Sequence, residues 1–275
     1  MKKKRAGLLL NAPYTVWAAI FIIVPLVIVV YYAFTDADGA FTLDNIHNLR
    51  DYADTFLISI LYSLAATLIT LVIAYPFAYA MTKKSITSQK MQMMLVMLPM
   101  WMNLLIRTYS WINILERNGL INNFLGLFDI EPIKMIGTPG AVILGLVYNY
   151  LPFMILPLYS VMTKIEPLLI EAATDLGCSP WETMKRVILP LSLPGVATGI
   201  TMVFVPSVST FVSSVMLGGG SFMLIGDLIE MQFLGNAYNP HLGAALSLVL
   251  MAILLLCMAI TDMFSNPEEK EGLLL

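Results

Sequence analysis

Polar side chains inside the hydrophobic stretches are the residues of this chain that could do chemistry. Arg107 lies in a long apolar stretch, and Asn103 and Ser110 are spaced from it so that one helical face carries all three. Ionisable groups at membrane depth are rare and usually face a bundle interior or a cavity. Such a stripe would orient a polar solute, or it would join helices by hydrogen bonds.

Two further polar groups lie in later apolar stretches. Tyr148 and Asn149 are adjacent, and Ser207, Thr210 and Ser214 form a hydroxyl stripe. With Asn103, Arg107 and Ser110, these residues are the candidate lining of a polar cavity between the third, fourth and fifth spans. Arg107 favours the cavity, whereas contacts between helices remain an equal alternative for the hydroxyls.

The sequence carries no pattern typical of catalysis. It has no G-x-x-x-x-G-K-[ST] loop, and Gly218-Gly219-Gly220 lacks the lysine of one. Cys178, Cys257, His47 and His241 are isolated, so no metal site is predicted. An embedded enzyme would need paired acid and base groups at one depth, and a proton-coupled transporter would need acids or histidines in its spans. We therefore expect a non-enzymatic protein that takes its energy from elsewhere, and a membrane scaffold or enzyme is the weaker alternative.

The elements that must position these residues are membrane-spanning helices. The chain is 59% hydrophobic and 12% charged, with a mean hydropathy of +0.81, whereas soluble domains are about 25% charged. Because about 20 apolar residues cross a bilayer, we predict an all-α membrane protein with six spans, the first retained rather than cleaved. The predicted spans are 13–34, 57–81, 91–115, 141–162, 191–217 and 242–261. Prolines 25, 76, 99, 152, 157 and 206 lie inside them and should kink helices.

Lysine and arginine positions predict the orientation, because these residues concentrate in cytoplasmic loops. A cytoplasmic N-terminus places most of them inside: Lys2, Lys3, Lys4, Arg5, Lys83, Lys84, Lys90, Lys164, Lys185, Arg186 and Lys270. Only Arg50, Arg117 and Lys134 then lie in outer loops. Those loops carry many acids, Asp227 among them, which would either attract a basic partner surface or serve only for solvation.

The stretch Ile165 to Pro190 has start and stop residues typical of two short helices, and it falls on the predicted cytoplasmic side. Pro167 suits a first helical turn, and Gly177 suits the residue after a helix end. Ser179-Pro180-Trp181-Glu182 is a capping box. Leu169, Ala172, Ala173 and Leu176 share one face. From amphipathicity alone this is either a connecting loop or a docking element, and its balanced charges argue against a nucleic-acid reader.

The same stretch resembles the signature of ABC-importer permeases. Glu171-Ala172-Ala173, Gly177, Val187 and Leu189-Pro190 match it, with valine in place of the usual isoleucine. The resemblance implies a type I importer fold in which this hairpin is the coupling helix that docks on a separate ATPase. The docking residues would be Glu171, Ala172, Ala173, Asp175, Leu176, Gly177, Ser179 and Pro180. It also implies a tail, first helix and outer loop over 1–56, a transmembrane domain over 57–262 with the hairpin at 165–190, and a cytoplasmic tail over 263–275.

Further segments are similar to the spermidine/putrescine permeases, in particular the B-type subunit. They include Arg107-Thr108-Tyr109-Ser110-Trp111, Cys178 to Thr183 and Met223-Leu224-Ile225-Gly226-Asp227. This resemblance implies alternating access in the cell membrane with a second permease, two ATPase subunits that bind ATP and Mg²⁺, and an extracytoplasmic polyamine-binding protein. Many relatives have acids where this chain has Thr210 and Val215. A path without these acids and with Arg107 would also suit an anion. A permease for sulfate, molybdate or phosphonate is therefore the alternative.

Overall fold

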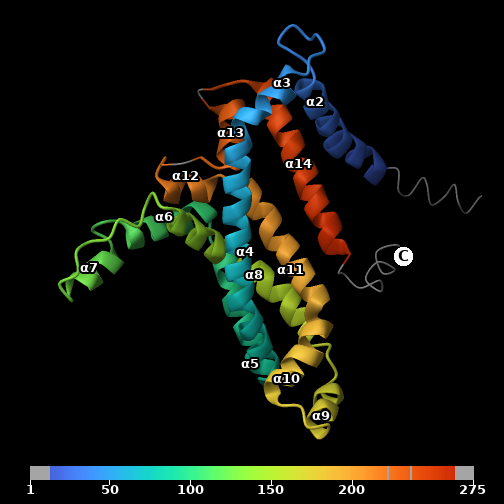
Figure 1. The fold of residues 1–275 in the computed structure, drawn as a ribbon, viewed down its shortest axis with the longest axis vertical. Helices are drawn as coiled ribbons and strands as arrows, with labels where there is room; N and C mark the ends of the chain where they lie inside the picture. The colour runs from blue at the N-terminus through green and yellow to red at the C-terminus, as the bar shows by residue number, and fades with distance from the viewer. Residues whose placement is uncertain (1–12, 222, 236, 264–275) are drawn as a thin grey trace, which may run out of the picture. The chain divides into compact units, whose positions relative to one another are not determined.

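The computed structural model describes residues 13–221, 223–235 and 237–263, and these residues are mostly helical (Figure 1). Five helical segments are long and apolar enough to cross a membrane in the described part of the chain: Pro13–Ala33, Asp44–Thr82, Pro139–Met162, Pro180–Ser209 and Pro240–Asp262. The all-α prediction is therefore confirmed, and each of these segments overlaps one predicted span. The basic residues 2–5 and the predicted tail from residue 264 onward lie outside the described residues.

The chain divides into two compact units, and the first contains residues up to Asp54 together with Leu228–Ile253. Its helices are η1 (Ala19–Ile23), α2 (Val24–Ala33), α3 (Asp44–His47), η2 (Asn48–Tyr52), most of α13 (Ile225–Leu234) and the first part of α14 (Pro240–Asp262). Ala33, Ala244 and Ala245 form its core, and the Asn45 amide donates to the Ala33 and Thr35 carbonyls at 3.3 and 2.9 Å. Small side chains therefore pack α2 against α14, and the Asn45 amide joins α3 to the end of α2.

The second unit, Thr55–Asp227 with Leu254 onward, contains the candidate site. Its long helices are α4 (Ala53–Thr82), α8 (Pro139–Met162) and α11 (Leu189–Ser209). They enclose a core of Ala74, Ala78, Met154, Leu158 and Val203, among others. α8 and α11 continue through Pro152, Pro157, Pro194 and Pro206, and α4 continues through Pro76. In a bundle, neighbouring helices and side chains satisfy the backbone groups that proline leaves free.

The predicted third span, 91–115, is interrupted beside Pro99, where the sequence predicted a kink, and it is not a single long helix. The chain forms α5 (Ile86–Met97), η3 (Leu98–Trp101) and α6 (Leu104–Leu115). Pro99 begins the tight η3 turn, Met102 is extended, and the Asn103 side chain accepts the Leu105 N–H at 2.8 Å. Because an asparagine cap satisfies a free N–H at a helix start, Asn103 begins a new helix here.

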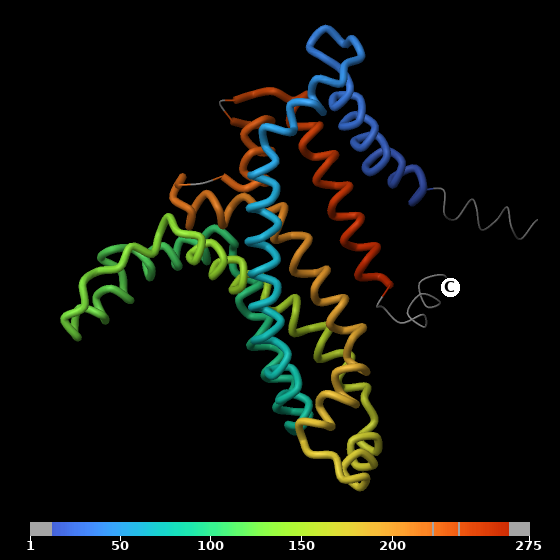
Figure 2. The backbone as a smooth tube through the Cα atoms, viewed as in Figure 1, coloured from blue at the N-terminus to red at the C-terminus, as the bar shows by residue number. Residues whose placement is uncertain are grey.

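The predicted fifth span is also broken. α11 ends at Ser209, Thr210 has an extended backbone with ψ 142°, and α12 follows at Val212–Gly218. Figure 2 shows the chain changing direction between α11 and α12. Ser207, Thr210 and Ser214 therefore lie on α11, in the break and on α12, and the expected single hydroxyl stripe is wrong.

The stretch 165–190 forms a hairpin as predicted, with one difference. α9 (Pro167–Asp175) ends at a turn in which Gly177 has φ +84°, and α10 (Pro180–Thr183) begins with the predicted capping box. α10 then continues through the π-turn η4 (Met184–Ile188) directly into α11. The second helix of the hairpin is therefore the start of a long helix, because Pro190 falls in the first turn of α11, where proline is tolerated.

Candidate functional site

The hairpin of α9 and α10, from Ile165 to Pro190, presents apolar side chains to solvent. Leu176 is 86% exposed, Trp181 is 74% exposed, and Leu168 is also exposed. Of the predicted stripe Leu169, Ala172, Ala173 and Leu176, only Ala173 is buried. In Figure 1 the hairpin lies at one end of α8 and α11, with α6 and α12 towards the other end. The hairpin therefore offers an uncovered apolar surface at the end of the helix bundle.

The charged residues of the hairpin are also accessible. Glu171 and Asp175 are exposed, and so are Gly177, Ser179 and Pro180. Glu182 accepts the Ser179 N–H at 2.9 Å and lies 3.7 Å from Arg186 across one helical turn. The predicted docking residues thus surround the turn between α9 and α10. Their role as a docking site stays a prediction.

A hydrogen-bonded clamp that sequence reasoning missed joins the base of the hairpin to the turn between α4 and α5. The Tyr159 hydroxyl, near the end of α8, donates to the Gln89 side-chain oxygen at 2.7 Å. The Gln89 amide donates to the Lys84 and Thr82 carbonyls at 2.8 and 3.3 Å. Beside it is a pocket of about 230 Å³, lined in part by Lys83, Pro167 and Ile188. The clamp therefore ties the end of α8, which leads into the hairpin, to α5 and to the end of α4.

A second polar group lies where α6, α8 and α12 meet. Asn149 is buried on α8, and its amide donates to the Ser213 hydroxyl of α12 at 3.2 Å. Arg107, on α6, is 9% exposed. Tyr150, next to Asn149 on α8, donates to the Pro206 carbonyl near the end of α11 at 3.3 Å. Asn149 is therefore joined to α12 and Tyr150 to α11, and the cavity predicted around Arg107 and Asn149 stays a prediction.

The remaining predicted cavity residues have other surroundings. Ser110 is exposed and donates to the Ile106 carbonyl of its own helix, while Asn103 serves as the α6 cap. Tyr148 packs edge-on against Trp111, with 5.3 Å between ring centroids. Ser207 is buried and donates back to the Val203 carbonyl at 2.6 Å. The hydroxyls of Ser110 and Ser207 are therefore bonded within their own helices and not to another helix.

Asp227 is a buried carboxyl residue whose position the sequence predicted wrongly. It was expected on an outer loop, but it is 3% exposed and accepts the Ser214 hydroxyl and the Leu224 N–H. The neighbouring Ile225 N–H donates to Ser59 of α4 at 2.8 Å. We call Ser59, Ser214, Leu224, Ile225 and Asp227 the Asp227 network. Through it the segment after α12 is joined both to α12 and to α4.

Gly226 lies at the centre of this network and packs directly on the break between α11 and α12. A Cβ atom at this position would lie 2.6 Å from the Thr210 carbonyl oxygen and 2.8 Å from that of Ser209. Only glycine permits an approach this close to backbone atoms. The contact partners are 16 and 17 positions away in the chain, so no local pattern signals it.

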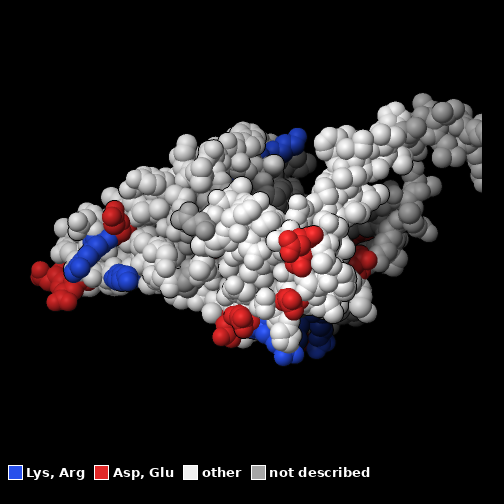
Figure 3. Space-filling view, turned by 90° about the horizontal axis from the view of Figure 1, so that it is seen from above, with Lys and Arg blue, Asp and Glu red and all other residues white. Residues whose placement is uncertain are grey.

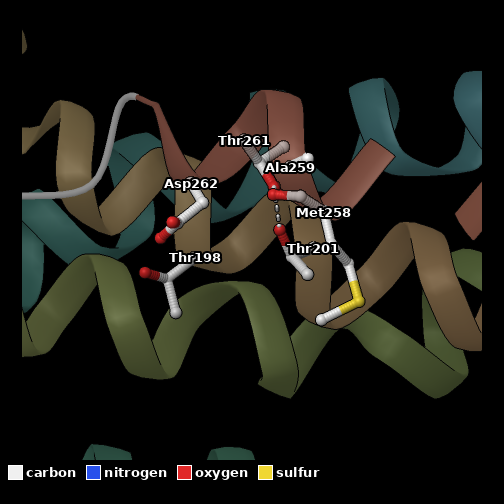
Figure 4. A pocket seen from close by; sticks show the side chains of 6 residues that line it. All are labelled: Thr198, Thr201, Met258, Ala259, Thr261 and Asp262. Carbon is white, nitrogen blue, oxygen red and sulfur yellow. Dashed lines mark hydrogen bonds between the residues drawn. The ribbon is translucent and has the colours of Figure 1, made fainter. Parts of the chain in front are cut away.

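Another pocket of the second unit lies between α11 and the last turn of α14. It encloses about 380 Å³ and is lined by Thr198, Thr201, Met258, Ala259, Thr261 and Asp262. Figure 4 shows the Thr201 and Thr261 hydroxyls paired across it, at 2.7 Å. Thr198 donates to the Pro194 carbonyl of its own helix. The pair of Thr201 and Thr261 therefore joins α11 to α14.

Charged side chains are sparse on the surface, as expected of a membrane protein. In the view of Figure 3, the few acidic and basic groups lie beside one another in small clusters on a mostly uncharged surface. Many large apolar side chains of η1, α2 and α4 are exposed, among them Phe21, Val27, Leu61 and Val72. Such surfaces are covered by lipid or by partner proteins.

The comparison with protein families decides the identity of this fold. The family model described as "Binding-protein-dependent transport system inner membrane component" matches residues 1–266. The chain belongs to this family. It is a permease-type component of a transport system, and its apolar helices agree with the inner-membrane location that the family description gives.

Individual relatives agree with this membership. The chain is 39% identical over 249 residues to the spermidine/putrescine transport system permease protein PotB of Escherichia coli (strain K12), covering 86% of this chain and 90% of that protein. The fold matches a bacterial ABC transporter involved in the import of the acidic polysaccharide alginate, with TM-score 0.75, 19% identity, and coverage of 96% of this chain and 99% of the other. A second structure, of the alginate transporter in complex with an alginate pentasaccharide-bound periplasmic protein, gives TM-score 0.76 and 17% identity over 95% of this chain and 94% of that one.

Proposed function

We propose that this chain is the permease subunit of an ATP-driven importer that moves spermidine and putrescine across the cell membrane. The observation that carries this proposal is the 39% identity to PotB over nearly the whole length of both proteins. Motifs of polyamine permeases extend from the Arg107 segment to the Met223–Asp227 segment. The latter contains Gly226, which packs against the chain between α11 and α12, and Asp227, which is hydrogen-bonded to Ser214 of α12.

The energy comes from a separate ATPase that binds ATP and Mg²⁺ and docks on the exposed hairpin. Leu176 and Trp181 offer apolar anchors, and Glu171, Ala172, Asp175, Gly177, Ser179 and Pro180 surround them. Exposed apolar patches bounded by polar residues commonly mark protein interaction sites. The Gln89–Tyr159 clamp would pass a hairpin movement to α4, α5 and α8.

The proposed assembly contains two ATPase subunits, a second permease and an extracytoplasmic polyamine-binding protein. The distribution of lysine and arginine supports a cytoplasmic N-terminus and a cytoplasmic hairpin. The polar region around Asn149 and Ser213 then belongs to the outer half of the bundle, where the solute enters. Access alternates as the ATPase closes and reopens, and this chain itself carries out no hydrolysis.

An anionic solute is the second candidate, and one observation favours it. Arg107 is a buried cation close to the entry side, and a fixed cation repels polyamines. Thr210 and Val215 also replace the acids of many relatives. Sulfate, molybdate and phosphonate are the anions that such a path would suit.

Uptake by proteoliposomes that contain the full complex tests the proposal. We expect labelled spermidine and putrescine to accumulate only when ATP and the binding protein are both present. Unlabelled sulfate in hundredfold excess should not compete. ATP-dependent uptake of sulfate without uptake of either polyamine would replace the proposed substrate with an anion.

A further inference from the structure

A pocket of about 520 Å³ lies in the segment between α6 and α8, residues 116–136, which we call the outer lobe. It is lined by Glu116, Arg117, Pro132, Lys134, Met135 and Ile136. The lobe contains α7 (Leu120–Gly126), and in Figure 1 α7 extends beyond α6, to the side of the long helices α4 and α11. The distribution of lysine and arginine predicts that this lobe lies on the outer side of the membrane.

The buried side chain of Asn122 ties the two walls of this pocket together. Its amide donates to the Glu116 carbonyl at 3.1 Å and to the Ile133 carbonyl at 3.0 Å, and its oxygen accepts the Ile133 N–H at 2.9 Å. Gly119 packs closely on the end of α6, since a Cβ atom there would lie 2.6 Å from the Ile114 carbonyl oxygen. The walls of the pocket are therefore fixed by buried contacts.

Three charged side chains line the pocket without neutralising one another. Glu116, Arg117 and Lys134 are exposed, and none of them forms an ion pair with another residue that the structure describes. Two cations can hold a phosphate by charge-assisted hydrogen bonds, whereas a carboxylate accepts such bonds from a protonated amine. A ligand that carries a phosphate and a primary amine close together therefore satisfies all three side chains.

Large apolar side chains are exposed beside this pocket. Leu120, Phe124 and Leu127 are spaced to share one face of α7 and its end, and all three are exposed. The rings of Phe124 and Phe128 pack edge-on, with 5.4 Å between their centroids. Ile133, next to Lys134, is exposed as well. Leucine and phenylalanine on one face of a helix, with basic residues near it, are typical of segments that lie in a membrane interface.

We propose that α7 lies in the outer interface of the bilayer and that the pocket binds the headgroup of a phosphoethanolamine lipid. Arg117 and Lys134 hold the phosphate, and Glu116 accepts hydrogen bonds from the amine. A soluble phosphoethanolamine has the same charged groups, but it has no acyl chains to cover Ile133 and the apolar face of α7, so a lipid is the better occupant. This lipid contact depends neither on the solute nor on the docking of the ATPase.

The first test measures the depth of α7 in a bilayer. The full complex is placed in nanodiscs with a fluorescent amino acid in place of Leu127, and the quencher is a phospholipid with brominated acyl chains. The matched control carries the same fluorescent amino acid in place of Asp38, an exposed residue of another predicted outer loop. We expect quenching to be severalfold stronger at position 127 than at position 38.

The second test identifies the headgroup with a photo-crosslinking amino acid in place of the exposed Ile133. The nanodiscs contain equal amounts of phosphatidylethanolamine, phosphatidylcholine and phosphatidylglycerol, and mass spectrometry identifies the lipid adducts. Phosphatidylethanolamine adducts should exceed the other two severalfold. Glu116→Gln should abolish this preference, and Arg117→Gln combined with Lys134→Gln should lower all adducts. Arg50→Gln, at an exposed cation of another predicted outer loop, should change neither.

Several outcomes would overturn the inference. Equal quenching at positions 127 and 38 would remove α7 from the interface, and equal adducts from the three lipids would remove the headgroup site. Loss of the adducts in excess soluble glycerophosphoethanolamine would assign the pocket to a soluble ligand. If the extracytoplasmic binding protein shielded position 127 from a soluble quencher and brominated lipid did not quench it, α7 would be a protein-docking surface. Neither test measures transport, so a failure of polyamine uptake would leave this inference standing.

Discussion

The hairpin and the Asp227 network are both well defined, yet they are built in opposite ways. The hairpin is a continuous segment whose residues face outward, with Leu176 and Trp181 largely exposed. The Asp227 network joins Ser59, Ser214 and Leu224 to Ile225 and Asp227 across 166 positions, and its members are buried. One is a surface prepared for a partner, whereas the other holds the chain's own helices together.

This contrast separates two kinds of effect that a substitution can have. A change in the Asp227 network removes buried hydrogen bonds or adds atoms where there is no space, so it should lower the free energy of unfolding. A change on the exposed hairpin should leave stability nearly intact and impair only what the hairpin binds. The four predictions below test the contrast in order of decreasing effect on stability.

Asp227→Ala should have the largest effect on stability. It leaves the buried Leu224 N–H without its acceptor and removes the bond between the Ser214 hydroxyl and the carboxyl group. Losing these buried hydrogen bonds costs about 3 kcal/mol. Thermal unfolding in detergent measures the loss, and Asp38→Ala, at an exposed aspartate, is the control. Equal melting temperatures for the two variants would contradict a structural role for Asp227.

Gly226→Ala should destabilise the protein by about 2 kcal/mol, because overpacking forces backbone to move. The new methyl group would lie 2.6 Å from the Thr210 carbonyl oxygen. Gly126→Ala is a matched control, since nothing lies within 4 Å of its added Cβ atom. The same unfolding assay should show a loss for the first variant alone. If both variants unfolded at the wild-type temperature, the close packing of Gly226 against the chain between α11 and α12 would be contradicted.

Ser179→Ala should cost about 1 kcal/mol, the usual value for the loss of a helix cap. The Ser179 hydroxyl accepts the Glu182 N–H at the start of α10. Because α10 continues into α11, we expect faster amide hydrogen exchange at residues 180–183 with little change elsewhere. Ser110→Ala, which removes a hydroxyl bonded only within its own helix, serves for comparison. Unchanged exchange at the start of α10 would count against the cap.

Leu176→Ser should change stability by less than about 0.5 kcal/mol, the range of ordinary surface substitutions. Its effect should appear instead as weaker binding of the ATPase, because an exposed apolar anchor is lost. Leu127→Ser alters an equally exposed leucine far from the hairpin in sequence and should leave ATPase binding unaltered. Wild-type ATPase binding by the Leu176 variant would remove this residue from the docking surface.

The sequence predicted what depends on local pattern. Pro167, Gly177 and the capping box at Ser179 each act within a few residues, so the hairpin and its turn were predicted correctly. Hydrophobic length likewise located the five long helices. The resemblance of Glu171-Ala172-Ala173 and Gly177 to importer permeases pointed to the family that the comparison confirmed.

The sequence did not predict what depends on contacts between distant residues. Hydropathy over 91–115 and 191–217 is continuous, but the Asn103 cap and the packing of Gly226 on Thr210 break both helices. Asp227 looked like a loop acid because its partners Ser214 and Leu224 come from a fold that composition does not reveal. The six-span count and the docking role of the hairpin stay predictions.

Labelling of Cys178 tests the central claim most directly, since this residue lies in the turn of the hairpin and is partly exposed. In a Cys257→Ser background it is the single thiol of the chain. We predict that a membrane-impermeant maleimide reacts with it only from the cytoplasmic side, and that bound ATPase slows the reaction severalfold. Reaction from the outer side, or an equal rate with and without the ATPase, would contradict the account.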